Sequence, residues 1–283
     1  MSNESGGRSS GARRGRGPAA PSGTKTQDFD LSRKVAMVAG GAGYLGQAIC
    51  RALAEQGATV MVADLARERA EALAADIAAR GGKARAVGLD VADEASSRNA
   101  VARTVADGGR LDVLVNATFF SIGKTVDALS AEEFDQANRV NLTGAFLLAR
   151  EAARVMSSGG SMVFFASVYG VVAPDPRVYP PPMNPNPIEY GVGKAGVIQM
   201  TRYLAVSWGA RGIRVNAIAP GPFPRSDAQQ RYPEFVQRLA EKVPLGRVGR
   251  QEEIAGTVVF LASDASSYLT GATLNVDGGW TAW

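Results

Sequence analysis

The sequence predicts one α/β domain, a doubly wound parallel β-sheet with helices on both faces. Three observations predict this fold class. Short apolar runs typical of buried parallel strands alternate with longer helical stretches from residue 34 to the end of the chain. A glycine-rich turn follows the first run, and polar or turn-forming residues follow most of the later ones. Because ligands of such sheets bind beyond the carboxyl ends of the strands, we expect these residues to form one site.

The first expected strand, residues 35–39, leads into the glycine-rich turn and then a helix. Backbone N–H groups at the start of such a helix can face a pyrophosphate, and glycines permit the close approach. The candidate cofactor ligands in this turn are Gly40, Gly43, Tyr44, Leu45 and Gly46. The three glycines are spaced three residues apart, which differs from the G-x-G-x-x-G fingerprint. The turn alone therefore does not establish a dinucleotide site, and the next strand has to support that interpretation.

The second expected strand, residues 58–63, ends at Asp64, which lies 18 residues after Gly46. An acidic side chain at about this distance can bind both ribose hydroxyls of an adenosine, and it would repel a 2′-phosphate. We therefore expect NAD rather than NADP as the cofactor, although Arg67 and Arg69 could partly offset the charge. The alternative is that Asp64 only caps the next helix.

The remaining strands are expected at residues 83–89, 111–115, 161–166, 214–218 and 273–276. Helices are expected at 66–80, 95–107, 130–156, 190–208 and 251–262, the third of them opened by a capping box at Ser130 and Glu133. The candidate ligands at or beyond the strand ends are Asp90, Val91, Asn116, Ser167, Pro220 and Gly221. The pattern shows neither an internal repeat nor a second domain.

Tyr190 and Lys194 stand four residues apart, so they lie on the same face of the expected helix. A nearby ammonium favours the phenolate and lowers the pKa of a phenol. That would make Tyr190 usable as an acid and base near neutral pH. Taken alone, the pattern is more often two surface residues, and its value comes from the motifs elsewhere in the chain.

Together these motifs resemble the short-chain dehydrogenase/reductase family, in its smaller single-domain branch, over about residues 32–283. The motifs that support the resemblance are the glycine turn at 39–46, Asp64, Asp90-Val91, Asn116, Asn141, Ser167, Tyr190-x-x-x-Lys194, Arg214-Val215-Asn216, Pro220-Gly221, and residues 244–247 and 276–279. The resemblance implies a Rossmann-type NAD(P)-binding domain over residues 28–283. It also implies a homo-oligomer, either a tetramer or a dimer.

The resemblance further implies roles for individual residues. Tyr190 would exchange a proton with the substrate oxygen, and Lys194 would hold the nicotinamide ribose and lower the pKa of Tyr190. Ser167 would hydrogen-bond the substrate carbonyl or hydroxyl, while Asn141 would hold a water in a proton relay. Phe223 joins Pro220 and Gly221 as an expected cofactor contact.

The chain departs from the family pattern at several places. Ala39 replaces the usual Thr before the glycine turn, and the usual Asn-Asn-Ala-Gly after the fourth strand reads Asn-Ala-Thr-Phe, ending at Phe119. Arg225 stands where a cofactor-contacting Thr is usual. We expect Phe119 and Phe120 either to wall the pocket or to join the core.

The largest departure is an insert at residues 173–187, between Ser167 and Tyr190, which holds seven of the 14 prolines. Proline fixes φ and favours extended backbone, so the insert should be stiff. We expect it to form one wall of the substrate pocket, the alternative being a surface excursion or a subunit contact. The candidate substrate ligands are Arg177 and Tyr179 in the insert and Arg225 beyond it.

Composition narrows the class of protein. The first 27 residues hold five of the 31 basic and one of the 27 acidic residues, which leaves 26 of each in the rest of the chain. We expect this tail to be disordered and expect no nucleic-acid partner, although its arginines leave that alternative open. No apolar run is long enough to span a bilayer. The lone Cys50 suits a reducing compartment, so we expect a cytoplasmic protein. The absence of His removes Ser-His-Asp mechanisms, and we expect no metal.

The sequence therefore predicts an NAD-dependent oxidoreductase that interconverts a secondary alcohol and a ketone by hydride transfer. A sugar, polyol or sugar acid is the expected substrate. An NADPH-dependent 3-oxoacyl thioester reductase is the alternative within the enzymes, and Asp64 argues against it. An epimerase draws support only from the glycine spacing. In a different class, the chain could be a cofactor-sensing regulatory protein on the same fold, although such proteins typically lose the catalytic Tyr or Lys.

Overall fold

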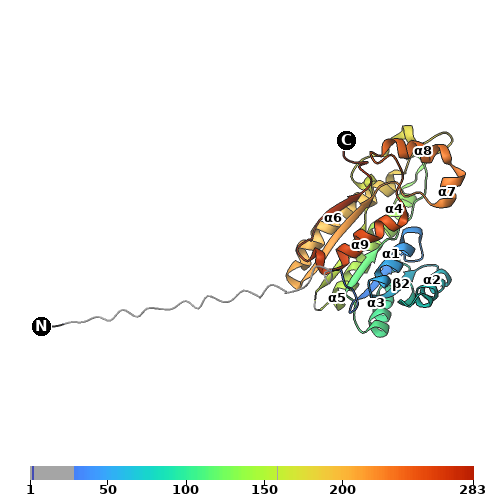
Figure 1. Ribbon diagram of the computed structural model, residues 1–283. Helices are drawn as coiled ribbons and strands as arrows, with labels where there is room; N and C mark the ends of the chain where they lie inside the picture. Colours follow the sequence, from blue (N-terminus) through green and yellow to red (C-terminus); the bar gives the residue numbers. More distant parts are fainter. Residues whose placement is uncertain (1, 3–28, 158) are drawn as a thin grey trace.

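The computed structural model describes residue 2, residues 29–157 and residues 159–283 (Figure 1). The tail predicted at 1–27 therefore lies almost wholly outside the described residues. Seven parallel strands form one sheet in the order β3-β2-β1-β4-β5-β6-β7, which confirms the predicted fold class. The strands are β1 (Val35–Ala39), β2 (Thr59–Asp64), β3 (Lys83–Gly88), β4 (Val113–Asn116), β5 (Gly160–Phe165), β6 (Ile213–Pro220) and β7 (Thr273–Val276).

Helices cover both faces of the sheet, as Figure 1 shows. On one face, α3 (Glu94–Gly108), α5 (Ala145–Val155) and α6 (Ile188–Trp208) pack their apolar sides on alternate strand residues. On the other face, α1 (Tyr44–Glu55), α2 (Arg67–Ala79) and α9 (Gln251–Ala262) do the same. The strand order changes direction at β1, which has β2 on one side and β4 on the other. A ligand site is expected at such a reversal.

One predicted helix is interrupted. The capping box at Ser130 is present and opens α4 (Ala131–Asn138), but the next six residues, Arg139–Gly144, form a π-helical stretch before α5 begins. Such wide turns recur at functional sites. Here the stretch contains Asn141, which is buried. The sequence pattern missed this interruption because the apolar spacing continues through it.

Two short helices were not predicted. α7 (Ser226–Arg231) and α8 (Pro233–Lys242) follow β6, and α8 begins with a proline in its first turn. Proline at that position is a helix-start signal that the sequence offered. Figure 1 shows α7, α8 and the C-terminus grouped at one end of the molecule. They lie beyond the sheet and so can enclose a site there.

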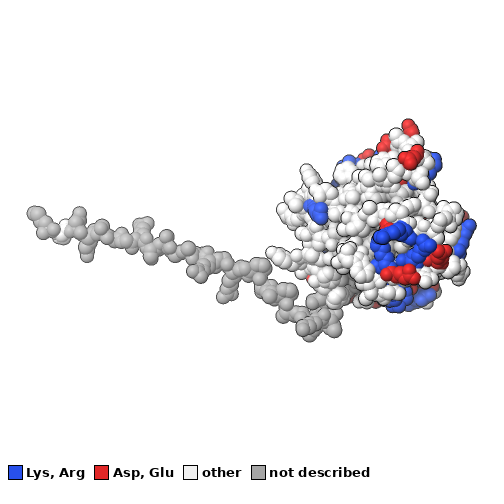
Figure 2. Space-filling view, turned by 90° about the horizontal axis from the view of Figure 1, so that it is seen from above, with Lys and Arg blue, Asp and Glu red and all other residues white. Residues whose placement is uncertain are grey.

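Charge on the described surface is mixed rather than uniformly basic. Figure 2 shows a largely uncharged face on which the largest group of basic side chains adjoins acidic ones and smaller charged groups of both signs lie near the edges. Among the described residues, no helix is both long and apolar enough to cross a membrane.

Candidate active site

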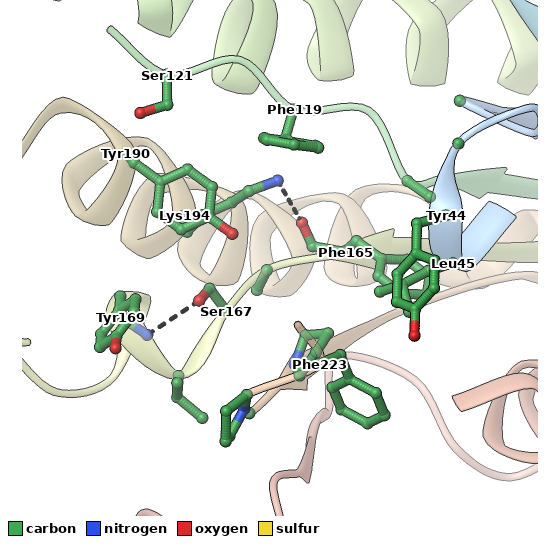
Figure 3. Close-up of a pocket in the computed structure, with 18 of the residues that line it drawn as sticks. Tyr44, Leu45, Phe119, Ser121, Phe165, Ser167, Tyr169, Tyr190, Lys194 and Phe223 are labelled. Carbon is green, nitrogen blue, oxygen red and sulfur yellow. Dashed lines mark hydrogen bonds between the residues drawn. The ribbon is translucent and has the colours of Figure 1, made fainter. Parts of the chain in front are cut away.

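A cavity of about 450 Å³ opens beyond the carboxyl ends of the central strands. Its lining comes from the glycine turn, from the segments that follow β4, β5 and β6, and from α6. Figure 3 shows Tyr190, Lys194 and Ser167 on one side of this space and Tyr44 and Leu45 on the other. The structure therefore brings Ser167, Tyr190, Lys194 and the glycine turn to one place, although they lie far apart in the sequence.

Lys194 projects from α6 into the floor of the cavity and is only 2% exposed. Its Nζ donates to the Phe165 carbonyl at 2.8 Å and to the Thr118 carbonyl at 3.2 Å. Burial lowers the pKa of Lys194 to about 7. Because an ammonium has three N–H donors, the charged form retains one for a ligand hydroxyl after making these two bonds.

Tyr190 lies one helical turn before Lys194, and the Lys194 Nζ is 5.6 Å from the centre of its ring. Burial raises the pKa of Tyr190 above its usual value of 10.0, and the Ser167 hydroxyl acts in the opposite direction. Burial thus opposes the lowering that the sequence predicts, and the effect of Lys194 on this pKa stays a prediction. The rings of Phe119 and Tyr190 also pack edge to face, with their centres 6.4 Å apart.

Ser167 follows β5 and is buried. Its hydroxyl oxygen accepts a hydrogen bond from the backbone N–H of Tyr169 at 3.1 Å, drawn as a dashed line in Figure 3. Because a hydroxyl both accepts and donates, the Ser167 proton is left to donate to a substrate oxygen. This arrangement suits the role that the family resemblance implies.

Asn141 holds the segment opposite Tyr190 rather than lining the cavity. Its side-chain amide donates to the Phe120 carbonyl at 2.7 Å and accepts from the Phe120 N–H at 3.0 Å. This pair of bonds fixes the chain next to Phe119, which lines the cavity. The role of Asn141 in a proton relay stays a prediction.

The glycine turn has the geometry of a dinucleotide cradle. Gly40 has φ of 74°, and a Cβ placed on Gly46 would lie 2.1 Å from the Gly40 carbonyl oxygen, so α1 can begin this close to the turn only with glycine. The start of α1 has no side-chain cap, which leaves its backbone N–H groups for an anion. With the buried Lys194 at the other end of the cavity, these residues fit a nicotinamide dinucleotide.

Asp64 ends β2 and is 8% exposed. Its two carboxylate oxygens accept from the backbone N–H groups of Ala42 and Ala66, each at 3.0 Å. Asp64 thus braces the glycine turn and also caps the chain before α2. Since each carboxylate oxygen can accept more than one bond, these contacts leave capacity for ribose hydroxyls.

Other expected cofactor residues occupy the strand ends without lining the cavity. Asp90 accepts from the Ala92 N–H at 2.9 Å, Val91 is buried beside Gly144, and Asn116 accepts from Thr118. By contrast, the segment after β6 lines the cavity with Pro220, Gly221, Phe223 and Arg225. The Arg225 side chain is largely exposed and pairs with Asp227 at 3.2 Å.

The structure does not bring Arg177 into the site. Its side chain is 89% exposed and is held by Asp175, which also binds Lys242 of α8 at 3.0 Å. Arg177 was expected to bind the substrate, but its contact with Asp175 holds it at the surface. Within the insert, Asn186 lines the cavity. Tyr179, the other candidate there, does not line it and packs on Phe235 of α8 instead.

Sequence reasoning missed two aromatic residues that line the cavity, Tyr169 and Trp280. Tyr169 stands two residues after Ser167 in the 3₁₀ turn η3 (Val168–Gly170). That closeness to Ser167 was the signal available in the sequence. Nothing local indicated Trp280, which lies near the end of the chain and reaches the cavity only through the fold.

The chain is similar to several known proteins. Residues 40–281 match a family model described as enoyl-(acyl carrier protein) reductase. The chain is 37% identical over 267 residues to D-threitol dehydrogenase of Mycolicibacterium smegmatis, covering 90% of this chain and 95% of that one.

Two solved structures are similar over nearly their whole lengths. A gluconate 5-dehydrogenase from Burkholderia cenocepacia in complex with NADP and tartrate has a TM-score of 0.82 at 31% identity, covering 91% of this chain and 98% of that one. An NAD⁺-bound xylitol dehydrogenase has a TM-score of 0.81 at 30% identity, covering 88% and 99% respectively.

Proposed function

Since this chain belongs to the short-chain dehydrogenase/reductase family, we propose that it oxidises a secondary alcohol of a polyol, sugar or sugar acid with NAD. Membership makes it a nicotinamide-dependent oxidoreductase that interconverts an alcohol and a ketone. The observation that supports the proposal best is that Ser167, Tyr190 and Lys194 line the same cavity as the glycine turn.

The chain's own residues account for the proton side of this reaction. A substrate oxygen between Tyr190 and Ser167 would accept a bond from the Ser167 hydroxyl and exchange its proton with Tyr190. In its protonated form, Lys194 would hold a ribose hydroxyl of the cofactor with its third N–H donor. The bound nicotinamide supplies or accepts the hydride.

Because the pKa of Tyr190 is raised, alcohol oxidation and ketone reduction should depend on pH in different ways. A buried phenol is held in its protonated form, which can donate a proton to a ketone but cannot take one from an alcohol. We therefore expect kcat/KM for alcohol oxidation to rise with pH on the alkaline side, while ketone reduction persists at lower pH. A pH profile of both directions with the same alcohol and ketone pair tests this.

The substrate class draws on the relatives and on the cavity. The similar proteins include a threitol, a gluconate and a xylitol dehydrogenase, so polyhydroxylated compounds recur among them. The cavity itself is lined mainly by apolar and aromatic groups with a few polar ones, among them Ser121 and Asn186. That pattern suits a small substrate whose hydroxyl groups are bound at a few defined points.

NAD is proposed over NADP because of the charge of Asp64 at the end of β2. One similar structure holds NADP and another NAD⁺, so the choice depends on this chain's own residues. Among these, Arg67 is exposed and paired with Glu71 at 2.8 Å. We expect kcat/KM to be higher with NAD than with NADP and expect Asp64→Ala to narrow the ratio by about tenfold. An equal or higher value with NADP for the unaltered enzyme would contradict the proposal.

Acyl thioester reduction is the second candidate, because the matching family model is described as an acyl carrier protein reductase. An NADPH-dependent 3-oxoacyl thioester reductase would need room for a phosphopantetheine arm and a site for the 2′-phosphate. A regulatory, cofactor-sensing role is a third reading, against which stand the retained Tyr190 and Lys194.

One substrate panel separates these readings. Purified enzyme is incubated with NAD and xylitol, D-threitol, gluconate or a steroid alcohol, and in the reverse direction with NADPH and an acetoacetyl thioester. Release or loss of the reduced cofactor is followed by absorbance. Turnover of polyols with NAD supports the proposal, whereas turnover confined to the thioester with NADPH replaces it. Cofactor binding without turnover of any compound would favour the regulatory reading.

We also propose a cytoplasmic homo-oligomer. Cys50 is buried as a free thiol, which suits a reducing compartment. Tyr203 and Val206 on α6 and Tyr268 expose large apolar surfaces, which soluble chains often cover by association. Light scattering after gel filtration measures the mass, and a monomer at micromolar concentration would contradict the oligomer.

A further inference from the structure

Tyr169 has no part in the proton chemistry above, yet it lies at the reacting end of the cavity. It lines the cavity together with Ser167 and Tyr190, and its backbone N–H binds the Ser167 hydroxyl at 3.1 Å. Figure 3 shows Tyr169 beside Ser167, in the part of the cavity that Tyr190 also enters. A substrate whose alcohol is bound by Ser167 and Tyr190 therefore has Tyr169 as its neighbour.

The Tyr169 ring is held on two sides. Its hydroxyl is 2.8 Å from the hydroxyl of Tyr179, and its ring meets Trp280 edge to face with the centres 6.4 Å apart. A phenolic hydroxyl is one donor and one acceptor. The bond to Tyr179 uses one of these functions and leaves the other for a polar group in the cavity.

Tyr179 is in turn held by the proline-rich insert and α8. Its ring packs on Phe235 with the centres 5.2 Å apart, and the neighbouring Val178 is buried in an apolar cluster with Leu239 and Val243. Asp175 ties the start of this segment to Lys242. The insert thereby fixes Tyr179, and Tyr179 fixes the hydroxyl of Tyr169.

We propose that Tyr169 is a specificity-determining residue that binds a second hydroxyl group of the substrate, adjacent to the alcohol held by Ser167 and Tyr190, and that Tyr179 positions it. An alcohol group matches whichever function Tyr169 has left, because a hydroxyl can donate or accept. A carboxylate could only accept. This inference rests on the proposed function, since it presumes that Tyr190 and Ser167 bind an alcohol.

The test uses substrate pairs that differ by one hydroxyl group: butane-2,3-diol with 2-butanol, and cyclohexane-1,2-diol with cyclohexanol. For each pair, the ratio of kcat/KM for the diol to that for the mono-alcohol is measured with NAD. The unaltered enzyme should favour the diol, and Tyr169→Phe should reduce the ratio roughly tenfold, mainly through KM, as expected for loss of one hydrogen bond. Tyr232→Phe, at an exposed tyrosine just before α8 that does not line the cavity, serves as the control and should leave the ratio unchanged.

Tyr179→Phe should lower the ratio in the same direction, and the double variant should lose no more than Tyr169→Phe alone. Such non-additivity is expected when one residue acts through the other. Persisting turnover of the mono-alcohols shows that each variant is folded. An unchanged ratio in Tyr169→Phe would overturn the proposal while leaving the proposed function intact. Additive losses would overturn the positioning role of Tyr179. An unaltered enzyme that did not favour the diols, or that oxidised none of the four alcohols, would also overturn the role of Tyr169. The proposed function is tested separately, by the panel of polyols.

Discussion

Because Lys194 is buried, the stability of the protein should depend measurably on pH. In the unfolded chain this lysine has its ordinary pKa of 10.5, whereas burial lowers the pKa to about 7 in the folded protein. Between these two values the unfolded state binds more protons than the folded state. Lys194 therefore makes the free energy of unfolding rise as the pH rises through this window.

The magnitude follows from the two pKa values. Integrating the proton difference for this one group between about pH 7 and about pH 9 gives a gain on the order of 2 kcal/mol in the free energy of unfolding. Lys194→Met removes the titration while keeping an unbranched side chain of similar length. Between the lower and the higher pH, the free energy of unfolding of the variant should therefore rise by about 2 kcal/mol less than that of the unaltered protein.

The assay is urea unfolding without cofactor at the two pH values and at one protein concentration. Lys194→Met also leaves the Phe165 and Thr118 carbonyls without their lysine donor. That shifts its stability at both pH values and cancels in the difference between them. Lys83→Met, at an exposed position of β3, controls for loss of a lysine as such. A pH-dependent difference between unaltered protein and Lys194→Met that is zero or of opposite sign would refute the reasoning.

Three further predictions concern the site. Tyr190→Phe should lower kcat by roughly 10²–10⁴ while fluorescence titration shows that NADH still binds; near-normal kcat would refute the acid/base role. Gly46→Ala should destabilise the protein by about 1–3 kcal/mol in thermal unfolding, because its Cβ would clash with the Gly40 carbonyl. Gly88→Ala, with open space around it, is the control, and equal losses in both variants would contradict the packing argument. Arg177→Ala should change kcat/KM for gluconate and xylitol by less than about twofold, because the side chain lies on the surface. A selective loss of kcat/KM with gluconate would show instead that Arg177 binds the substrate.

Much of the fold followed from local patterns. The strands from β1 to β7 were expected to within two residues at their ends, because most are short apolar runs bounded by turn residues. The positions of Ser167, Tyr190 and Lys194 on one side of the sheet also followed, since parallel strands end at the same edge and α6 places residues four apart on one face. The interruption of the helix before α5 did not follow, because a single widened turn leaves the apolar spacing almost unchanged.

The family roles rest on the same local order of motifs, which the chain keeps despite its departures. Phe119, one of these departures, lines the cavity against Tyr190. The glycine spacing, which differs from the standard fingerprint, still yields a turn in which Gly40 and Gly46 pack without room for a side chain. Backbone geometry at a turn depends on few neighbouring residues, so it was open to prediction.

By itself, then, the sequence determined the layered sheet, the glycine turn and the placing of Tyr190 and Lys194, all of which depend on spacing along the chain. Only the tertiary structure decided the pKa of Tyr190, the exclusion of Arg177 and the place of Tyr169 beside Tyr179. Each of these depends on distant partners: the solvent displaced around α6, the Asp175 contact with Lys242 of α8, and the packing of the insert on Phe235. Electrostatic and packing energies of buried groups are sums over neighbours in space, and spacing along the chain does not specify those neighbours.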